Sequence, residues 1–169
     1  MKTRLLITAF LLLFCITVST AAEVKGRVLN YGVFKRSEKE EVVKTPETTS
    51  GITRIPSGIP ILTTATNRIP AKTGICFGMW YEVTNLKAKD GDSVDIVKVV
   101  RHPMMTKPDG TTSKGFTFVE KQIAKDGRVL SWTGYGFDHP YELAPGVWEI
   151  AMKHDGKTLF TQEFIVAPK

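Results

Sequence analysis

The sequence predicts an all-β protein, a sandwich or barrel of about seven to nine strands. The runs between its turn signals are rich in Val, Ile, Phe, Thr and Trp, which are residues typical of strands. No stretch after residue 22 has the periodicity of an amphipathic helix. Turn signals recur along the chain at Asp90-Gly91, Asp109-Gly110, Asp126-Gly127, Pro145-Gly146 and Asp155-Gly156.

The first element, residues 1–22, has the order of charges and apolar residues found in a secretory signal peptide. Lys2 and Arg4 form a cationic start, residues 5–18 are almost wholly apolar, and small residues end the segment at Ala22. The apolar run is shorter than the about 20 residues that a membrane-spanning helix needs. We therefore expect cleavage after Ala22, no transmembrane segment afterwards, and a periplasmic or secreted protein.

The remaining chain, residues 23–169, has the length of one domain. We expect strands at residues 24–34, 41–44, 61–66, 74–85, 93–101, 115–124, 128–133, 147–153 and 158–166. The segment 35–60 contains a mixed charge cluster, and Pro56 and Pro60 cannot donate to a strand ladder. This segment is predicted to be a long loop within the domain.

The C-terminal hairpin permits a register prediction. Trp148, Ile150 and Met152 alternate on one strand, and Phe160 and Phe164 alternate on the next. A two-residue turn would place Ile150 opposite Thr161, whereas a three-residue loop ending at a left-handed Gly156 would place Ile150 opposite Phe160. Because the three-residue loop puts all apolar residues on one face, the pattern favours it.

Four segments of the chain resemble a known protein family. They are Thr133-Gly-Tyr-Gly-Phe-Asp-His-Pro-Tyr-Glu-Leu-Ala-Pro-Gly-Val-Trp148, Arg101-His102-Pro103, Arg68-Ile69-Pro70-Ala71 and Tyr31-Gly32-Val33-Phe34. In order and spacing they resemble an uncharacterised family of exported bacterial proteins, described only as a domain of unknown function. The resemblance spans residues 24–166 and implies an envelope protein with an immunoglobulin-like fold, an antiparallel β-sandwich. It implies no activity.

Composition and motifs argue against several classes of function. The net charge of +6 comes from basic residues interleaved with acids, and no basic run follows a nucleic-acid backbone. No G-x-S-x-G or H-E-x-x-H motif is present, so we expect binding rather than catalysis, without a cofactor. Cys76 is the single cysteine after the signal segment and is interpreted as a small buried residue.

A metal site is the alternative function. His102, Met104 and Met105 lie together at the end of a predicted strand, where Pro103 is expected to end it. Thioether and imidazole groups suit copper. The same two methionines can equally pack a loop, and both interpretations remain open.

A group of aromatic residues is a further candidate site. Trp132, Tyr135 and Tyr141 are interleaved with glycines and accompanied by His139, and they can form a flat platform for sugar or peptide, or a core around a tight bend. Arg101 and His102 join them as candidate binding residues, and Tyr141 can anchor the turn before the last hairpin by its hydroxyl group.

An open sandwich also has edge strands to which a partner can add a strand. The leading prediction is therefore a non-catalytic binding or interaction module of the cell envelope, with another envelope protein as its partner.

Overall fold

A computed structural model describes residues 22–168 as an all-β chain with one short helix. Residues 1–21 of the predicted signal peptide lie outside this range. The structure has eleven strands, more than the predicted seven to nine. They are β1 (Lys25–Lys35), β2 (Glu40–Lys44), β3 (Ile52–Pro56), β4 (Ile61–Thr64), β5 (Arg68–Ile69), β6 (Cys76–Thr84), β7 (Ser93–Thr106), β8 (Thr112–Ile123), β9 (Val129–Gly136), β10 (Gly146–His154) and β11 (Lys157–Val166), with the 3₁₀ helix η1 at Pro140–Glu142.

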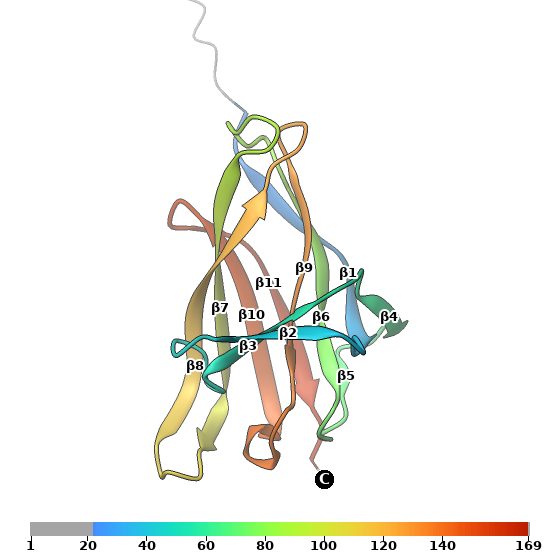
Figure 1. Cartoon of the computed structure of the whole chain (residues 1–169), viewed down its shortest axis with the longest axis vertical. Coiled ribbons are helices and arrows are strands. Elements are labelled where there is room, and N and C mark those ends of the chain that lie inside the picture. Colours follow the sequence, from blue (N-terminus) through green and yellow to red (C-terminus); the bar gives the residue numbers. More distant parts are fainter. Residues whose placement is uncertain (1–21, 169) are drawn as a thin grey trace, which may run out of the picture.

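The strands form two large sheets and one separate hairpin (Figure 1). One sheet has the order β4-β1-β6-β9, and the other has the order β5-β11-β10-β7-β8. All pairings in the two sheets are antiparallel except that of β5 with β11, which is parallel. The expectation of a fully antiparallel sandwich was therefore wrong at this one pairing. The parallel pairing arises because Arg68 and Ile69 lie beside Ile165 and Val166 at the end of the last strand.

The core lies between the two large sheets and is built around aromatic rings. Phe77 of β6 contacts Trp148 of β10 and Phe164 of β11, with ring centroids 5.7 and 5.0 Å apart. The indole of Trp148 is fully buried and donates its N–H to the carbonyl of Ala144 at 2.9 Å. Since these contacts join strands of both sheets, one core holds the molecule together.

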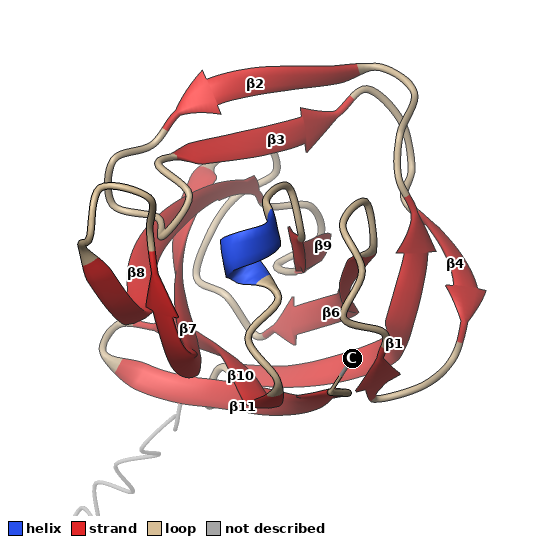
Figure 2. Cartoon of the chain, turned by 90° about the horizontal axis from the view of Figure 1, so that it is seen from below, coloured by secondary structure: helices blue, strands red, loops and turns tan. Residues whose placement is uncertain are grey.

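The segment 35–60, predicted to be a long loop, contains the hairpin β2–β3. Glu40 pairs with Pro56 and Lys44 pairs with Ile52, so Pro56 occupies the last position of the ladder, where its missing N–H does no harm. The hairpin is a sheet of its own, and Figure 2 shows it crossing one side of the molecule from β8 toward β1 and β4. The strands β2 and β3 are short and contain many polar residues. For this reason the sequence pattern predicted only the first of them, at residues 41–44.

Strand β7 continues through Pro103 to Thr106, whereas we expected Pro103 to end it. The pairing of β7 with β8 is interrupted between Arg101 and Met105, so the proline lies in an irregular region where no ladder donor is required. Beyond this irregularity Met105 pairs with Ser113, and the strand resumes.

The register of the C-terminal hairpin differs from the predicted one. The turn is the two-residue Asp155-Gly156, with φ of 47° and 76°, and His154 pairs with Lys157. An irregularity between Met152 and Lys153 shifts the register, so that Met152 faces Phe160, Ile150 faces Gln162 and Trp148 faces Phe164. The apolar residues share one face, as the sequence pattern predicted. The register that allows this comes from one extra residue in β11, Leu159, and not from a longer loop.

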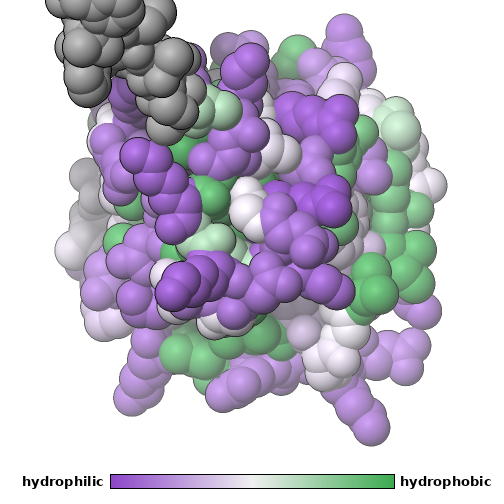
Figure 3. All heavy atoms as spheres, turned by 90° about the horizontal axis from the view of Figure 1, so that it is seen from above, coloured by the Kyte–Doolittle hydropathy of each residue, from purple (hydrophilic) through white to green (hydrophobic). Residues whose placement is uncertain are grey.

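The end of the molecule that carries the β6–β7 and β8–β9 connections has a mainly hydrophilic surface, with apolar patches toward its margin (Figure 3). None of the helical segments within residues 22–168 has the length and apolar character required to cross a membrane.

Candidate functional site

A cavity of about 400 Å³ lies between the β2–β3 hairpin and the two large sheets. The hairpin and its flanking segments supply one wall, and strands β6, β7, β8 and β9 supply the other. The side chains and glycines of this second wall are Cys76, Lys98, Phe116, Phe118, Glu120, Trp132, Gly134, Tyr135 and Gly136. The cavity therefore forms where the edge strands β8 and β9 face the crossing hairpin.

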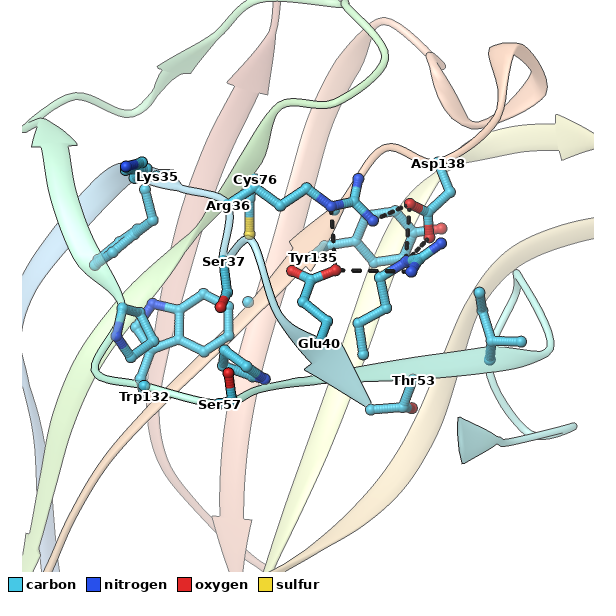
Figure 4. Close-up of a pocket in the computed structure, with 18 of the residues that line it drawn as sticks. Lys35, Arg36, Ser37, Glu40, Thr53, Ser57, Cys76, Trp132, Tyr135 and Asp138 are labelled. Carbon is cyan, nitrogen blue, oxygen red and sulfur yellow. Dashed lines mark hydrogen bonds and ion pairs between the residues drawn. The ribbon is translucent and has the colours of Figure 1, made fainter. Parts of the chain in front are cut away.

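Four charged side chains connect the hairpin to the sheet beside this cavity (Figure 4). Arg36 donates to Asp138 at 2.5 Å and to Glu40 at 3.2 Å. Arg54 donates to the two oxygens of Asp138 at 3.1 and 2.9 Å. Burial alone would raise the pKa of Asp138, but the hydrogen bonds from Arg36 and Arg54 outweigh it and lower that pKa. The carboxylate of Asp138 thus forms ion pairs with both arginines.

A second charged pair lies deeper in the cavity. Lys98 is only 7% exposed, and its ammonium donates to the Gly134 carbonyl at 2.5 Å and lies 3.7 Å from Oε1 of Glu120. Burial lowers the pKa of Lys98, and the carboxylate of Glu120 opposes this shift. The hydroxyl of Thr133 donates to the same Glu120 oxygen at 2.7 Å.

Two polar atoms of the cavity wall are buried without a protein partner. The indole Nε1 of Trp132 and the Oε2 oxygen of Glu120 make no hydrogen bond to any of residues 22–168. The large majority of buried side-chain polar atoms in folded proteins have a partner. Both atoms are closed to a water-sized probe, so they lie behind the cavity wall and do not face the open space.

The Cys76 side chain also lines the cavity, and burial raises the pKa of its thiol to about 11. At neutral pH the group is a neutral thiol and a poor nucleophile. Cys76 is half-buried and lies at the cavity, outside the core cluster, which corrects its interpretation as a small buried residue.

The predicted aromatic residues divide between two places. Trp132 and Tyr135 line the cavity, whereas His139 stacks on Tyr141 beside η1, with ring centroids 5.3 Å apart. Tyr135 donates its hydroxyl to the buried carboxylate of Glu142 at 2.6 Å. The anchoring role predicted for Tyr141 is thus held by Tyr135.

The other predicted residues lie away from this cavity. Arg101 is exposed and pairs with Glu149 at 2.6 Å. The ring of His102 is buried against Trp148, with its Nδ1 2.8 Å from the Pro103 carbonyl and its Nε2 3.0 Å from the Thr49 hydroxyl. Because a carbonyl only accepts, Nδ1 donates and Nε2 accepts from Thr49, so His102 ties the hairpin segment to β7.

The residues of the predicted metal site do not converge. Met104 is 57% exposed and Met105 is 1% exposed, while both ring nitrogens of His102 already have partners. Among residues 22–168 no three His, Cys, Asp or Glu side chains form a group that could hold a metal ion.

Sequence reasoning missed the charged groups of the cavity: Arg36, Glu40, Arg54, Lys98, Glu120 and Asp138. One signal was available, because Lys98 continues the alternation of Val94, Ile96 and Val100 and so stands at a core-facing position of β7. A lysine there must find a buried partner.

Comparison with known proteins gives a family and a fold. A family model described as a domain of unknown function (DUF3859) matches residues 23–166, which confirms the resemblance seen in the sequence. The crystal structure of an immunoglobulin-like protein from Pseudomonas aeruginosa is similar, with a TM-score of 0.61 and 24% identity over 87% of this chain and 98% of that chain. At this identity the similarity concerns the fold alone. Among curated proteins no match to this chain was found.

Proposed function

We propose, for a chain that belongs to the DUF3859 family, that it is a non-catalytic binding protein of the bacterial cell envelope which holds a small ligand in the cavity beneath the β2–β3 hairpin. In this proposal the chain is exported by its N-terminal signal and folds as an immunoglobulin-like sandwich. Its ligand enters between the hairpin and the edges of β8 and β9.

The observation that carries the proposal is the cavity itself, which is lined by aromatic and charged side chains and by glycines from the hairpin and from both large sheets. The cavity volume of about 400 Å³ lies within the range of small-molecule sites, which combine apolar and aromatic side chains with a few polar groups.

The experiment is native mass spectrometry of the protein recovered gently from its own cell envelope. We expect a mass excess of a small molecule on the wild-type chain and its loss in Gly136→Leu. Gly136 lines the cavity and a Cβ atom added there meets no atom within 4 Å, so the new side chain can fill space without a clash.

Thr117→Leu is the matched control, because it adds a similar apolar group at an exposed position of β8 that does not line the cavity. This variant should keep the mass excess. A bare wild-type chain, or equal excess in all three proteins, would contradict a ligand in this cavity.

A protein partner is the second candidate, favoured by apolar side chains exposed on and after the hairpin. Val42, Ile55, Ile59 and Ile61 are 51, 49, 79 and 61% exposed. If another envelope protein covers them, Ile59→Asp should abolish its cross-linking to this chain. Leu130→Asp, at an exposed site on β9, should leave it unchanged. Equal cross-linking of both variants would count against the partner.

A further inference from the structure

We propose that strand β2 of the hairpin pairs with β2 of a second copy of this chain, antiparallel and with the two Val42 residues opposite each other. The two hairpins then form one four-stranded sheet across the dimer. This surface lies on the outside of the hairpin and does not depend on a ligand in the cavity. Three features of β2 carry the proposal: its open edge, the direction of its backbone groups and the order of its side chains.

The outer edge of β2 is open to another strand. Within residues 22–168 the hairpin is a two-stranded sheet, in which β2 pairs with β3 alone. Figure 2 shows β2 as the outermost strand, farther than β3 from the two large sheets. Residues 41–44 are all exposed along it. Unpaired backbone groups on such an edge are a template for pairing with another chain.

The hydrogen bonds at the two ends of the hairpin show which backbone groups of β2 point outward. The Ser57 N–H donates to the Lys39 carbonyl at 3.0 Å, and the Thr45 N–H donates to the Gly51 carbonyl at 2.9 Å. Bonded and non-bonded pairs alternate along an antiparallel ladder, so the odd-numbered residues of β2 bond to β3. The N–H and C=O groups of its even-numbered residues therefore point to the open edge.

The opposite edge of the hairpin, on β3, is less suited to pairing. By the same alternation its outward-pointing residues are Ile52, Arg54 and Pro56. Pro56 has no N–H to donate, and the Ile52 carbonyl already accepts from the hydroxyl groups of Thr48 and Ser50 at 3.0 and 3.1 Å. Pairing through the hairpin therefore uses β2 and stops at two copies, as a closed twofold dimer does.

The side chains of β2 match a second copy of the same strand. Glu40, Val42 and Lys44 share one face, with an acid at one end and a base at the other. When the two Val42 residues lie opposite each other, Glu40 of each copy faces Lys44 of the other, so the dimer contains this pair twice. This register pairs all three outward residues, whereas a twofold axis at Glu41 or Val43 pairs only two of them.

Both charges can take part in this contact. Lys44 is exposed at the end of the strand. Glu40 uses its Oε2 oxygen for Arg36 and Arg54, at 3.2 and 3.7 Å, and within residues 22–168 its Oε1 oxygen forms no ion pair. The lysine of a second copy can therefore approach Oε1 while the contacts of Glu40 with both arginines remain.

Sedimentation equilibrium of the wild-type chain is the first test. An edge of five residues forms a small interface, and we expect a weak dimer with a Kd of about 0.1 mM. Val42→Pro should raise this Kd at least tenfold, because it removes an outward N–H at the centre of the contact and leaves the β2–β3 hydrogen bonds intact. Melting temperatures of the same samples show that the variants are folded.

A charge reversal tests the side-chain pairing. Lys44→Glu should also raise the Kd at least tenfold, because it sets two acids opposite each other in the dimer. Lys87→Glu makes the same change of charge at an exposed position between β6 and β7 and should leave the Kd unchanged.

Two cysteine variants at neighbouring exposed positions test the register. In Val42→Cys the two new thiols lie on directly opposite residues, with Cα atoms about 5.5 Å apart, which a disulfide can span. In Val43→Cys the two positions lie diagonally, about 7–8 Å apart, which is too far. We expect Val42→Cys to form a linked dimer on oxidation and Val43→Cys to behave as the wild-type chain, since Cys76 is present in all three.

The outcomes that contradict the proposal are distinct. A wild-type chain that sediments as a monomer at about 1 mM overturns the dimer. A dimer that Val42→Pro leaves unchanged pairs through another surface, such as the edge of β8, and overturns the role of β2. A dimer that Lys44→Glu and Lys87→Glu affect equally overturns the charge pairing. Linkage of Val43→Cys without linkage of Val42→Cys overturns the register.

Discussion

At the scale of single residues, the cavity concentrates groups that an ordinary core would not contain. Lys98 and Glu120 are charged side chains at inward-facing positions, and Trp132 has an indole N–H without a partner among residues 22–168. Such groups lower the stability of a fold unless they serve another purpose. Their clustering on one wall is therefore the local evidence for a site.

Cys76 permits a prediction about reactivity. Since burial raises the pKa of its thiol to about 11, its alkylation by iodoacetamide should be slow at pH 8. The rate should rise about tenfold for each pH unit up to pH 10, because the thiolate fraction rises by that factor. Mass spectrometry of the peptide that contains Cys76 measures this rate, and a plateau near pH 9 would show an unperturbed thiol.

The sequence identified part of the site at this scale. Trp132 and Tyr135 were predicted because aromatic residues interleaved with glycine are a visible local pattern. Asp138 and Arg54 are 84 residues apart and meet only through the crossing hairpin. No local pattern could bring them together, since the contact depends on a tertiary arrangement.

At the scale of elements, the alternation of apolar residues predicted which face of a strand is buried more reliably than it predicted the length of the connecting loop. Trp148, Ile150 and Met152 share a buried face, as their spacing requires. The alternation could not tell whether the register is set by a longer turn or by an extra residue inside β11, because both solutions bury the same side chains. The structure uses the extra residue, Leu159.

Deletion of Leu159 should therefore be tolerated. Met152 would still face Phe160, and the cost should be the lost packing of one partly buried leucine, about 1–2 kcal/mol. Deletion of Thr161 should cost more than deletion of Leu159, because Phe164 and Val166 can then stay in the core only if the extra residue is absorbed and Phe160 turns away from Met152. Urea denaturation of both variants measures the difference, and equal losses would contradict the role given to Leu159.

The attachment of the hairpin β2–β3 should depend on pH through Asp138. Its pKa is lowered in the folded protein, so the stabilisation is complete above the unfolded value of about 3.9 and is lost as the pH falls through the lower folded value. Amides of residues 40–56 should lose protection from hydrogen exchange below about pH 4, before the core strands do.

Asp138→Asn should have the same effect at neutral pH. It removes the charge shared by Arg36 and Arg54, and we expect exchange of the hairpin amides to rise about tenfold. The control is Asp95→Asn, which breaks an exposed pair with Lys121 and should change little. Unchanged hairpin exchange in Asp138→Asn would mean that other contacts, such as that of Thr49 with His102, suffice.

At the scale of the whole molecule, one aromatic core joins the two large sheets. Phe77 of β6 contacts residues of β9, β10 and β11, so its ring bridges both layers. A molecule joined in this way should unfold in one cooperative step.

Phe77→Ala should destabilise the fold by about 3–5 kcal/mol, the usual cost of a large cavity in a core. Val119→Ala, at an exposed position of β8, should change it by less than about 0.5 kcal/mol. Far-ultraviolet circular dichroism and tryptophan fluorescence should report the same midpoint for Phe77→Ala. Two separate midpoints would mean that the sheets unfold independently.

The crossing hairpin also bears on self-association. Strand β9 ends one of the large sheets, and such an edge is a template on which another chain can pair and aggregate. Here the Lys98 ammonium donates a hydrogen bond to the Gly134 carbonyl, and the hairpin faces Trp132, Gly134 and Gly136 across the cavity. Covering an edge with another segment is one device by which natural sheets prevent edge-to-edge growth. We therefore expect the segment that encloses the cavity also to keep this edge from pairing with a second copy of the chain.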